Sequence, residues 1–181
     1  MSRNSTISLV LTVIGDDRPG LVERLATVIS LHDGNWLESS MSHLSGKFAG
    51  IVCVSVADIH IDTLKAALGE LSGLRITAES SAASEIAETN TGGRRLKLSL
   101  VGHDRIGIVR EVSQVLARHA INVEVLNTHT ASAPMSAAIL FHANAELTAS
   151  SALDAHALTA DLELLSNDLM VDITLDETIR T

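Results

Sequence analysis

Apolar residues follow two spacings along the chain, and these spacings recur in the same order twice. Residues 7–14 and 96–101 are apolar runs of strand length, and each stops at a glycine. After each run, apolar residues return at intervals of three and four, which predicts the buried face of a helix. The helix positions are Leu21, Leu25, Val28 and Ile29 in the first copy and Ile108, Val112, Val115 and Leu116 in the second.

The second half of each copy predicts two more strands, a helix and a closing strand. Strands are expected over residues 36–44 and 123–131, and turns at residues 45–47 and 132–134 lead back into a third strand. Residues 74–79 and 171–176 alternate with a period of two, as closing strands do. The second helix is predicted from Ile61, Leu64, Leu68 and Leu71, with Leu153, Ala157, Ala160 and Leu164 as counterparts.

An internal repeat explains this recurrence. Residues 9–35 align without a gap to residues 96–122 at a constant offset of 87, and the same offset pairs residues 48–56 with 135–143. The second copy then holds about eight more residues around its second helix. Identical pairs are Leu9/Leu96, Leu11/Leu98, Gly15/Gly102, Asp17/Asp104, Arg18/Arg105, Gly20/Gly107, Val22/Val109, Val28/Val115, His32/His119 and Asn35/Asn122.

The order of elements predicts an α+β fold made of two tandem ferredoxin-like βαββαβ modules. Right-handed crossovers fold each copy into an antiparallel sheet with both helices on one face. We expect the first module over residues 5–81 and the second over residues 94–178. Residues 82–93 between them are rich in Ser, Ala, Thr, Asn and Gly, which is typical of a linker.

Composition narrows the functional classes. The formal net charge is −9, and the aromatic residues are Phe48, Phe141 and Trp36 alone. Direct nucleic-acid binding requires clustered cations or stacking aromatics, and only Arg94, Arg95 and Lys97 come near such a cluster. The chain is therefore predicted not to bind nucleic acid directly.

The compartment is predicted from the one cysteine and from the first apolar run. Cys53 has no disulfide partner and lies in an apolar run, so we expect a buried, inert thiol in a reducing, cytoplasmic setting. Residues 7–14 are too short to cross a membrane, and the turn that follows them favours a first buried strand.

The repeated motif Gly-x-Asp-Arg-x-Gly lies between the first strand and first helix of each copy. Free backbone N–H groups and the helix dipole at this position suit a carboxylate or phosphate, and Asp17 or Asp104 could accept an ammonium. Asn35 and Asn122, at the start of the next strand, are expected to come near the same position. The structural alternative is that the aspartate caps the helix, the glycines form a turn and the asparagine takes a left-handed conformation. Both interpretations stay open at this point.

The remaining polar residues predict neither catalysis nor a metal site. His32 and His119 each follow a predicted helix, where an imidazole can cap the last backbone carbonyl groups of the helix. His103 lies inside the second loop and could contact a carboxylate. No histidine pair is backed by Cys, Asp or Glu at metal-ligand spacing, and no nucleophile, phosphate-loop or dinucleotide motif is present. We expect no metal, no cofactor and no enzymatic activity.

At Asp17-Arg18-Pro19-Gly20-Leu21-Val22 and Asn35 the chain resembles the ACT domain family. As a tandem pair it is also similar to the glycine cleavage system transcriptional repressors and their relatives, through residues 15–20 and 43–50. In the second copy Ile106 replaces the proline, so that site is expected to be altered. The resemblance implies ligand-binding residues Gly15, Asp16, Asp17, Pro19, Gly20, Leu21 and Asn35 in the first copy, and His103, Asp104, Gly107, Ile108 and Asn122 in the second.

ACT domains are regulatory and bind small ligands, usually amino acids, between paired modules. The resemblance implies a regulator of transcription that senses glycine or a similar amino acid and acts through a DNA-binding activator protein. A formyltetrahydrofolate deformylase carries a similar module beside a catalytic domain for which 181 residues leave no room. The alternative is a ligand-independent interaction module. Because an open sheet has edges to protect, we also expect a homodimer.

Overall fold

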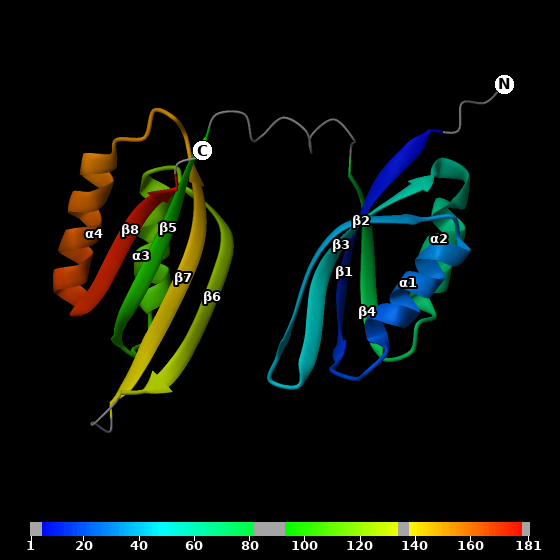
Figure 1. Cartoon of the computed structure of the whole chain (residues 1–181), viewed down its shortest axis with the longest axis horizontal. Helices are drawn as coiled ribbons and strands as arrows, with labels where there is room; N and C mark the ends of the chain where they lie inside the picture. Colours follow the sequence, from blue (N-terminus) through cyan, green and yellow to red (C-terminus); the bar gives the residue numbers. More distant parts are fainter. Residues whose placement is uncertain (1–4, 82–92, 134–137, 179–181) are drawn as a thin grey trace. The chain divides into compact units, whose positions relative to one another are not determined.

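The computed structural model describes residues 5–81, 93–133 and 138–178 (Figure 1). The chain divides into two compact units, residues 1–89 and 90–181, which are treated separately below. Residues 82–92 of the predicted linker and Pro134 of the second predicted turn lie outside the described residues.

The first module has the order βαββαβ. Its strand order is β2-β3-β1-β4, and the register of every neighbouring pair is antiparallel. A 3-10 turn, Asp58–His60, precedes the second helix. The elements are β1 (Thr6–Asp16), α1 (Leu21–Leu31), β2 (Asn35–Leu44), β3 (Lys47–Ala57), α2 (Ile61–Gly69) and β4 (Leu74–Ser81).

The second module repeats this topology, with the strand order β6-β7-β5-β8. The predicted fold class, α+β with two ferredoxin-like βαββαβ modules, is confirmed. The elements are β5 (Arg94–His103), α3 (Ile108–Arg118), β6 (Asn122–Ser132), β7 (Ile139–Ala149), α4 (Ala155–Leu169) and β8 (Val171–Thr178).

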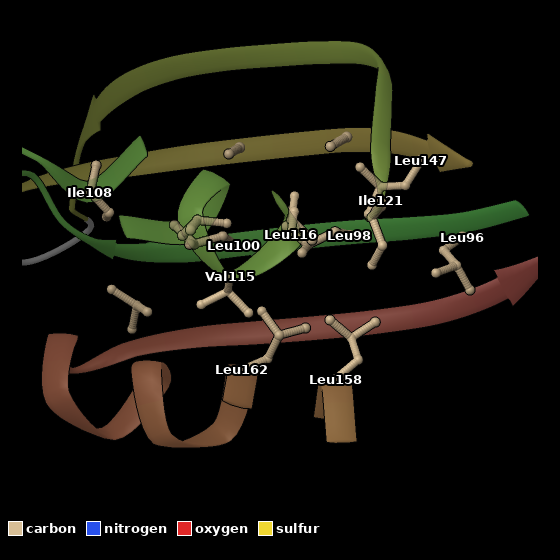
Figure 2. Close-up of a cluster of buried hydrophobic side chains, with 14 of the residues drawn as sticks. Leu96, Leu98, Leu100, Ile108, Val115, Leu116, Ile121, Leu147, Leu158 and Leu162 are labelled. Atoms are coloured by element: carbon tan, nitrogen blue, oxygen red, sulfur yellow. The ribbon is translucent and has the colours of Figure 1, made fainter. Parts of the chain in front are cut away.

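Each core lies between one face of the sheet and its two helices. In the second module Leu98 and Leu100 of β5 pack with Val115 of α3 and Leu158 of α4 (Figure 2). Alternate residues of a strand point to opposite faces, so the intervening residues lie on a face that carries no helix. Cys53 is one of these in the first module: Val52 and Val54 are fully buried, whereas Cys53 is half-buried on the helix-free face. The prediction of a buried cysteine is therefore wrong.

The predicted buried face of the fourth helix is also wrong. The buried residues of α4 are Leu158, Leu162 and Leu169, whereas Leu164 is 64% exposed. The helix begins after Asp154, whose side chain accepts the Ala157 N–H at 3.1 Å. Leucines and alanines are so frequent in this segment that two series at helical spacing coexist, and the sequence pattern alone does not distinguish them.

The offset between the copies does not stay at 87. Gly15 pairs with Phe48 and Gly102 pairs with Phe141, so the third strands align at an offset of 93. Gly15 also pairs with Leu74 and Gly102 with Val171, which raises the offset to 97 in the last strands. Six extra residues therefore lie in the β6–β7 hairpin and four around the second helix. The predicted alignment of residues 48–56 with 135–143, and the placing of all the extra residues at the helix, are wrong.

Candidate functional site

Gly15 and Gly102 sit at the ends of β1 and β5, where the neighbouring strand begins. A Cβ atom on Gly15 would lie 2.1 Å from the carbonyl oxygen of Gly73, and one on Gly102 would lie 2.1 Å from Val171 Cγ1. Neither position has space for a side chain. The repeated glycine is thus explained by close packing of the last strand of each module, whatever binds nearby.

Gly20 and Gly107 precede the first helix of each module in left-handed conformations, with φ of 87° and 95°. Neither helix has a side-chain cap, so the predicted capping role of Asp17 and Asp104 is wrong. These aspartates instead hold the loop through their backbone. The Asp17 N–H donates to Gly46 O, and the Asp104 N–H donates to Ile139 O, both at 3.0 Å.

The first-turn amides of α1 therefore remain available. The Arg24 N–H is the first to find a carbonyl partner, Gly20 O at 3.0 Å. Nothing in the described part of the chain accepts from the N–H groups of Leu21, Val22 and Glu23. The side chain of Leu21 is buried in the core, as is that of Ile108 in the second module, so only their main-chain atoms could meet a ligand. Pro19 is exposed within the loop itself.

A charged cavity lies at the end of β1. It has a volume of about 330 Å³ and is lined by Ile14, Gly15, Asp16, Lys47, Gly73, Leu74 and Arg75. Lys47 pairs with Asp16, and Arg18 lies 3.9 Å from the same carboxylate. Arg75 has no ion pair within the described residues. Lys47 and Arg75 of the lining, with Arg18 beside the Asp16 carboxylate, give an excess of positive charge that suits a carboxylate ligand.

The Asp16 carboxyl is the acidic group of this cavity. Its pKa is lowered because it accepts a hydrogen bond from Lys47 and because the charges of Lys47 and Arg18 favour the ionised form. Asp16 is therefore negatively charged at neutral pH and is suited to face an ammonium group. A small zwitterion carries one negative and one positive group, which match the cations and the carboxylate of this cavity.

The second module carries different chemistry at the same register positions. His103 stands in place of Asp16, Leu140 in place of Lys47 and Asp172 in place of Arg75. Arg105, the counterpart of Arg18, is held by Glu111 in the first turn of α3. The loop keeps its shape in this module, but the excess of positive charge is absent at these positions.

Asn35 and Asn122 do not come near the loops of their own modules. Asn35 pairs with Ser55 of β3, and Ser55 pairs with Ser8 of β1, seven residues before Gly15. At a rise of about 3.3 Å per residue this separation is roughly 23 Å. Asn122 is placed in the same way, through Thr148 and Arg95. The expectation that loop and asparagine meet within one module is wrong, because the helix between them returns the chain to the opposite end of the sheet.

The structure also corrects the alternative role of these asparagines. The left-handed residues after the first helices are Asp33 and Ala120, two positions earlier. Both asparagines instead begin a strand that is interrupted by a bulge, at Leu37 in β2 and at Glu124 in β6. Asn122 donates to the Glu124 carboxylate at 2.6 Å. The sequence did not predict these bulges. It also did not predict a role for Lys47 and Arg75, which stand out in the sequence only as charged residues beside apolar neighbours.

The histidines form no metal centre in the part of the chain that the structure describes. His32 contacts the carbonyl oxygen of Val28 at 2.9 Å, as predicted for a helix end. His119 instead contacts Asp161 of α4 at 3.0 Å, so the equivalent prediction for it is wrong. None of the described helices is long and apolar enough to span a membrane.

Two tandem βαββαβ modules, each with a glycine-bounded loop between its first strand and first helix, make up the described part of the chain. The sequence model of the ACT domain family matches residues 8–78. This range spans most of the first module, and the chain as a whole has a tandem ACT-like fold. A comparison with curated proteins finds no significant sequence match.

Solved structures cover almost the whole chain. A protein of unknown function from Galdieria sulphuraria is 29% identical, with a TM-score of 0.82 over 97% of this chain and 100% of that one. A candidate glycine cleavage system transcriptional repressor is 19% identical, with a TM-score of 0.71 over 97% of this chain and 99% of that one. A formyltetrahydrofolate deformylase from Pseudomonas syringae matches only 51% of this chain and 30% of that one at a TM-score of 0.42, which is too weak to bear on function.

Proposed function

We propose that the protein is a non-enzymatic regulator that binds a small amino acid, glycine or one of similar size, at the end of β1 in its first module. The observation that carries this proposal is the cavity lined by Asp16, Lys47 and Arg75 at the end of β1, directly before the loop that leads into α1. The α-carboxylate would be bound by the cations and loop amides, and the α-ammonium would face Asp16 or Asp17.

The regulated process is proposed from the relative described as a glycine cleavage system transcriptional repressor. The protein would control transcription of glycine cleavage or related amino acid metabolism in the cytoplasm, as a homodimer, through a DNA-binding activator protein. Direct contact with DNA is not required for this role. The basic run at the start of β5 is partly neutralised, because Arg94 pairs with Glu177 and Lys97 stands opposite Glu146.

Asn35 and Asn122 fit this proposal only if they serve a loop of another copy of the chain. Each lies about 23 Å from the loop of its own module, by the rise of the strands. ACT domains bind ligands between paired modules, so an asparagine from one copy of the chain can complete the loop of another copy. Such a site would use the loop of residues 15–21 or 102–108 from one side and the asparagine from the other.

Isothermal titration of the purified full chain with a panel of amino acids tests the proposal. We expect binding of glycine or a similarly small amino acid, weakened about tenfold or more by Lys47→Met or Arg75→Met, because each removes a cation that pairs with the carboxylate. The same titration of Asp17→Ala and Asn35→Ala tests whether the loop and the distant asparagine contribute to amino acid binding. The matched control is Arg105→Met in the second module, whose guanidinium is already held by Glu111.

The absence of binding by every amino acid would contradict the proposal and favour a ligand-independent interaction module. That second function is supported by the helix-free, partly apolar face of the first sheet, where Ile51 is 54% exposed. Co-purification of the protein from its native cells would then identify the protein that it binds.

A further inference from the structure

The helix-free face of the first sheet carries an ordered pattern of charge. Three successive rows of side chains cross the four strands, and the strand pairing shows which residues belong to each row. In the order β4, β1, β3, β2 the rows are Glu79, Val10, Cys53, Glu38; then Thr77, Thr12, Ile51, Ser40; then Arg75, Ile14, Ala49, Ser42.

The pattern has an acidic end, an apolar and hydroxyl-bearing centre, and a basic end. Ile51 is 54% exposed and Ile14 is 40% exposed, although both lie on inner strands of the sheet. Arg75 and Glu79 lie two residues on either side of Thr77 on the same edge strand. Neither has an ion pair among the residues that the structure describes. A surface of this kind complements a copy of itself turned end for end.

We propose that this face binds the same face of a second copy of the chain, around a two-fold axis that runs across the strands through Thr77 and Ile51. Strand β4 then lies over the partner's β4 in the reverse direction. Arg75 faces the partner's Glu79, and Glu79 faces the partner's Arg75. Ile51 lies against the partner's Ile51, and Val10 lies against the partner's Ile14, which gives the interface an apolar centre.

The charges select this arrangement over its alternatives. A two-fold axis along the strands would place Glu79 opposite the partner's Glu38, which is repulsive. The second module cannot pair with itself in the same way, because Asp172, Thr174 and Asp176 occupy the register positions of Arg75, Thr77 and Glu79. Two such faces would oppose aspartate to aspartate. The first module is therefore the self-complementary one.

The dimensions of the face predict a weak dimer. Four strands spaced about 4.8 Å apart, with nine residues at about 3.3 Å each, give a face of roughly 20 by 30 Å. Two such faces would bury on the order of 1,000 Å² in total, near the lower limit for specific interfaces. Dimerisation is therefore expected to depend on concentration, and it requires no amino acid.

Sedimentation velocity of the full chain without added amino acid, over a wide range of concentration, tests this interface. We expect a monomer–dimer equilibrium that Arg75→Glu weakens about tenfold or more, because it opposes glutamate to glutamate twice. The double variant Arg75→Glu with Glu79→Arg restores both pairs in the opposite sense and should return the dissociation constant to about the original value. Ile51→Glu should weaken the dimer at its centre.

Ile51 does not line the cavity at the end of β1, so its variant separates this interface from the amino acid site. Arg75 and Ile14 belong to both the cavity and the interface, but Ile51→Glu leaves them intact, so we expect this variant to lose the dimer and still bind the amino acid. The control is Asp172→Asn in the second module, which should leave the dissociation constant unchanged. A protein that stays monomeric at every concentration would overturn the proposal. So would a dimer that is indifferent to Ile51→Glu, or one that the double variant does not restore.

Discussion

Where β1 ends, the first module places Asp16, Lys47 and Arg75 around a cavity of about 330 Å³. Where β5 ends, the second module places His103, Leu140 and Asp172 at the same register positions. The two loops nevertheless share their glycines, their left-handed turns and their backbone hydrogen bonds to the neighbouring hairpin. The difference teaches that the repeated residues of the motif specify the path of the backbone, whereas the charges at the end of the strand come from positions that the repeat does not conserve.

The helix-free faces of the two sheets differ in the same sense. The second face is polar: Ser99 donates to Asn144 at 3.0 Å, and the rings of His129 and His142 stack with centroids 4.7 Å apart. The stacked histidines occupy the positions of Ser42 and Ala49 in the first module. Both cores keep aliphatic residues on the covered face. Burial thus preserves the covered face of each copy, and the open face is free to acquire a separate role.

The largest expected effect comes from the glycine that both modules need. Gly15→Ala should lower the free energy of unfolding of the first module by on the order of 4 kcal/mol, because its Cβ would meet the backbone oxygen of Gly73, which no rotamer change can move. Gly102→Ala should destabilise the second module for the same geometric reason, against Val171. Denaturant unfolding measures the loss, and hydrogen exchange assigns it to one module.

Gly69→Ala is the matched control, since the added Cβ would meet no atom within 4 Å apart from the backbone of its own helix and its chain neighbours. It should leave stability unchanged or raise it slightly. If Gly15→Ala were equally neutral, the repeated glycine would have to be explained by a ligand and not by packing.

The next effect tests which side of α4 forms the core of the second module. Leu158 is fully buried, so Leu158→Ala should lower the free energy of unfolding by about 3 kcal/mol. Leu164 is 64% exposed, so Leu164→Ala should change it by less than about 0.5 kcal/mol. Thermal unfolding of both variants gives the comparison. The reverse order would restore the helix face predicted from the sequence.

The sequence was sufficient for the fold where its signals are local and repeated. The strand–glycine–helix order, the identical pairs at an offset of 87 and the alternation in the last strands predict both modules. It failed at the β6–β7 hairpin and at α4, because the run of identical pairs at an offset of 87 ends at Asn122. The later identities, such as Phe48/Phe141 and Thr77/Thr174, are isolated and lie at other offsets, 93 and 97. An apolar segment with several helical series, such as residues 153–169, also does not say which series faces the sheet.

The candidate site was predicted only in part, and the reason is again physical. The motif identified the loop, but Lys47 and Arg75 reach the cavity from β3 and β4, and strand pairing over such distances leaves no trace in a single sequence. The sequence shows that Asn35 follows the first helix, but it does not show at which end of the sheet that helix ends. The predicted position of Asn35 near the loop was wrong for this reason.

A smaller effect on self-association is expected if the helix-free face of the second sheet receives the charge order of the first. Asp172→Arg places a cation, a threonine and an acid on β8, in the order that β4 has at Arg75, Thr77 and Glu79. Because both modules would then be self-complementary, we expect species larger than a dimer at high concentration in sedimentation velocity. Asp172→Asn, which only removes the repulsion, should form no such species. Unchanged behaviour of Asp172→Arg would mean that charge order does not suffice to pair these faces.

The smallest effect concerns an ion pair that only the second module has. Arg94 contacts the Glu177 carboxylate through Nε at 2.8 Å and Nη2 at 2.9 Å, tying the start of β5 to the end of β8, whereas Ile7 and Ser80 stand there in the first module. The hydrogen bond from Arg94, and then its charge, lower the pKa of Glu177 below its usual 4.5.

A lowered native pKa contributes stability that is complete above the pKa of the unfolded chain and is lost as the pH falls through the native pKa. Glu177→Gln should therefore reduce the free energy of unfolding slightly at neutral pH, and the difference from the original chain should shrink below about pH 4. Because the pair is partly exposed, added salt should also narrow the difference. Hydrogen exchange should assign the change to β5 and β8 and leave β1 and β4 unaffected. A difference that persisted unchanged into acid would show that Glu177 acts by packing and not by charge.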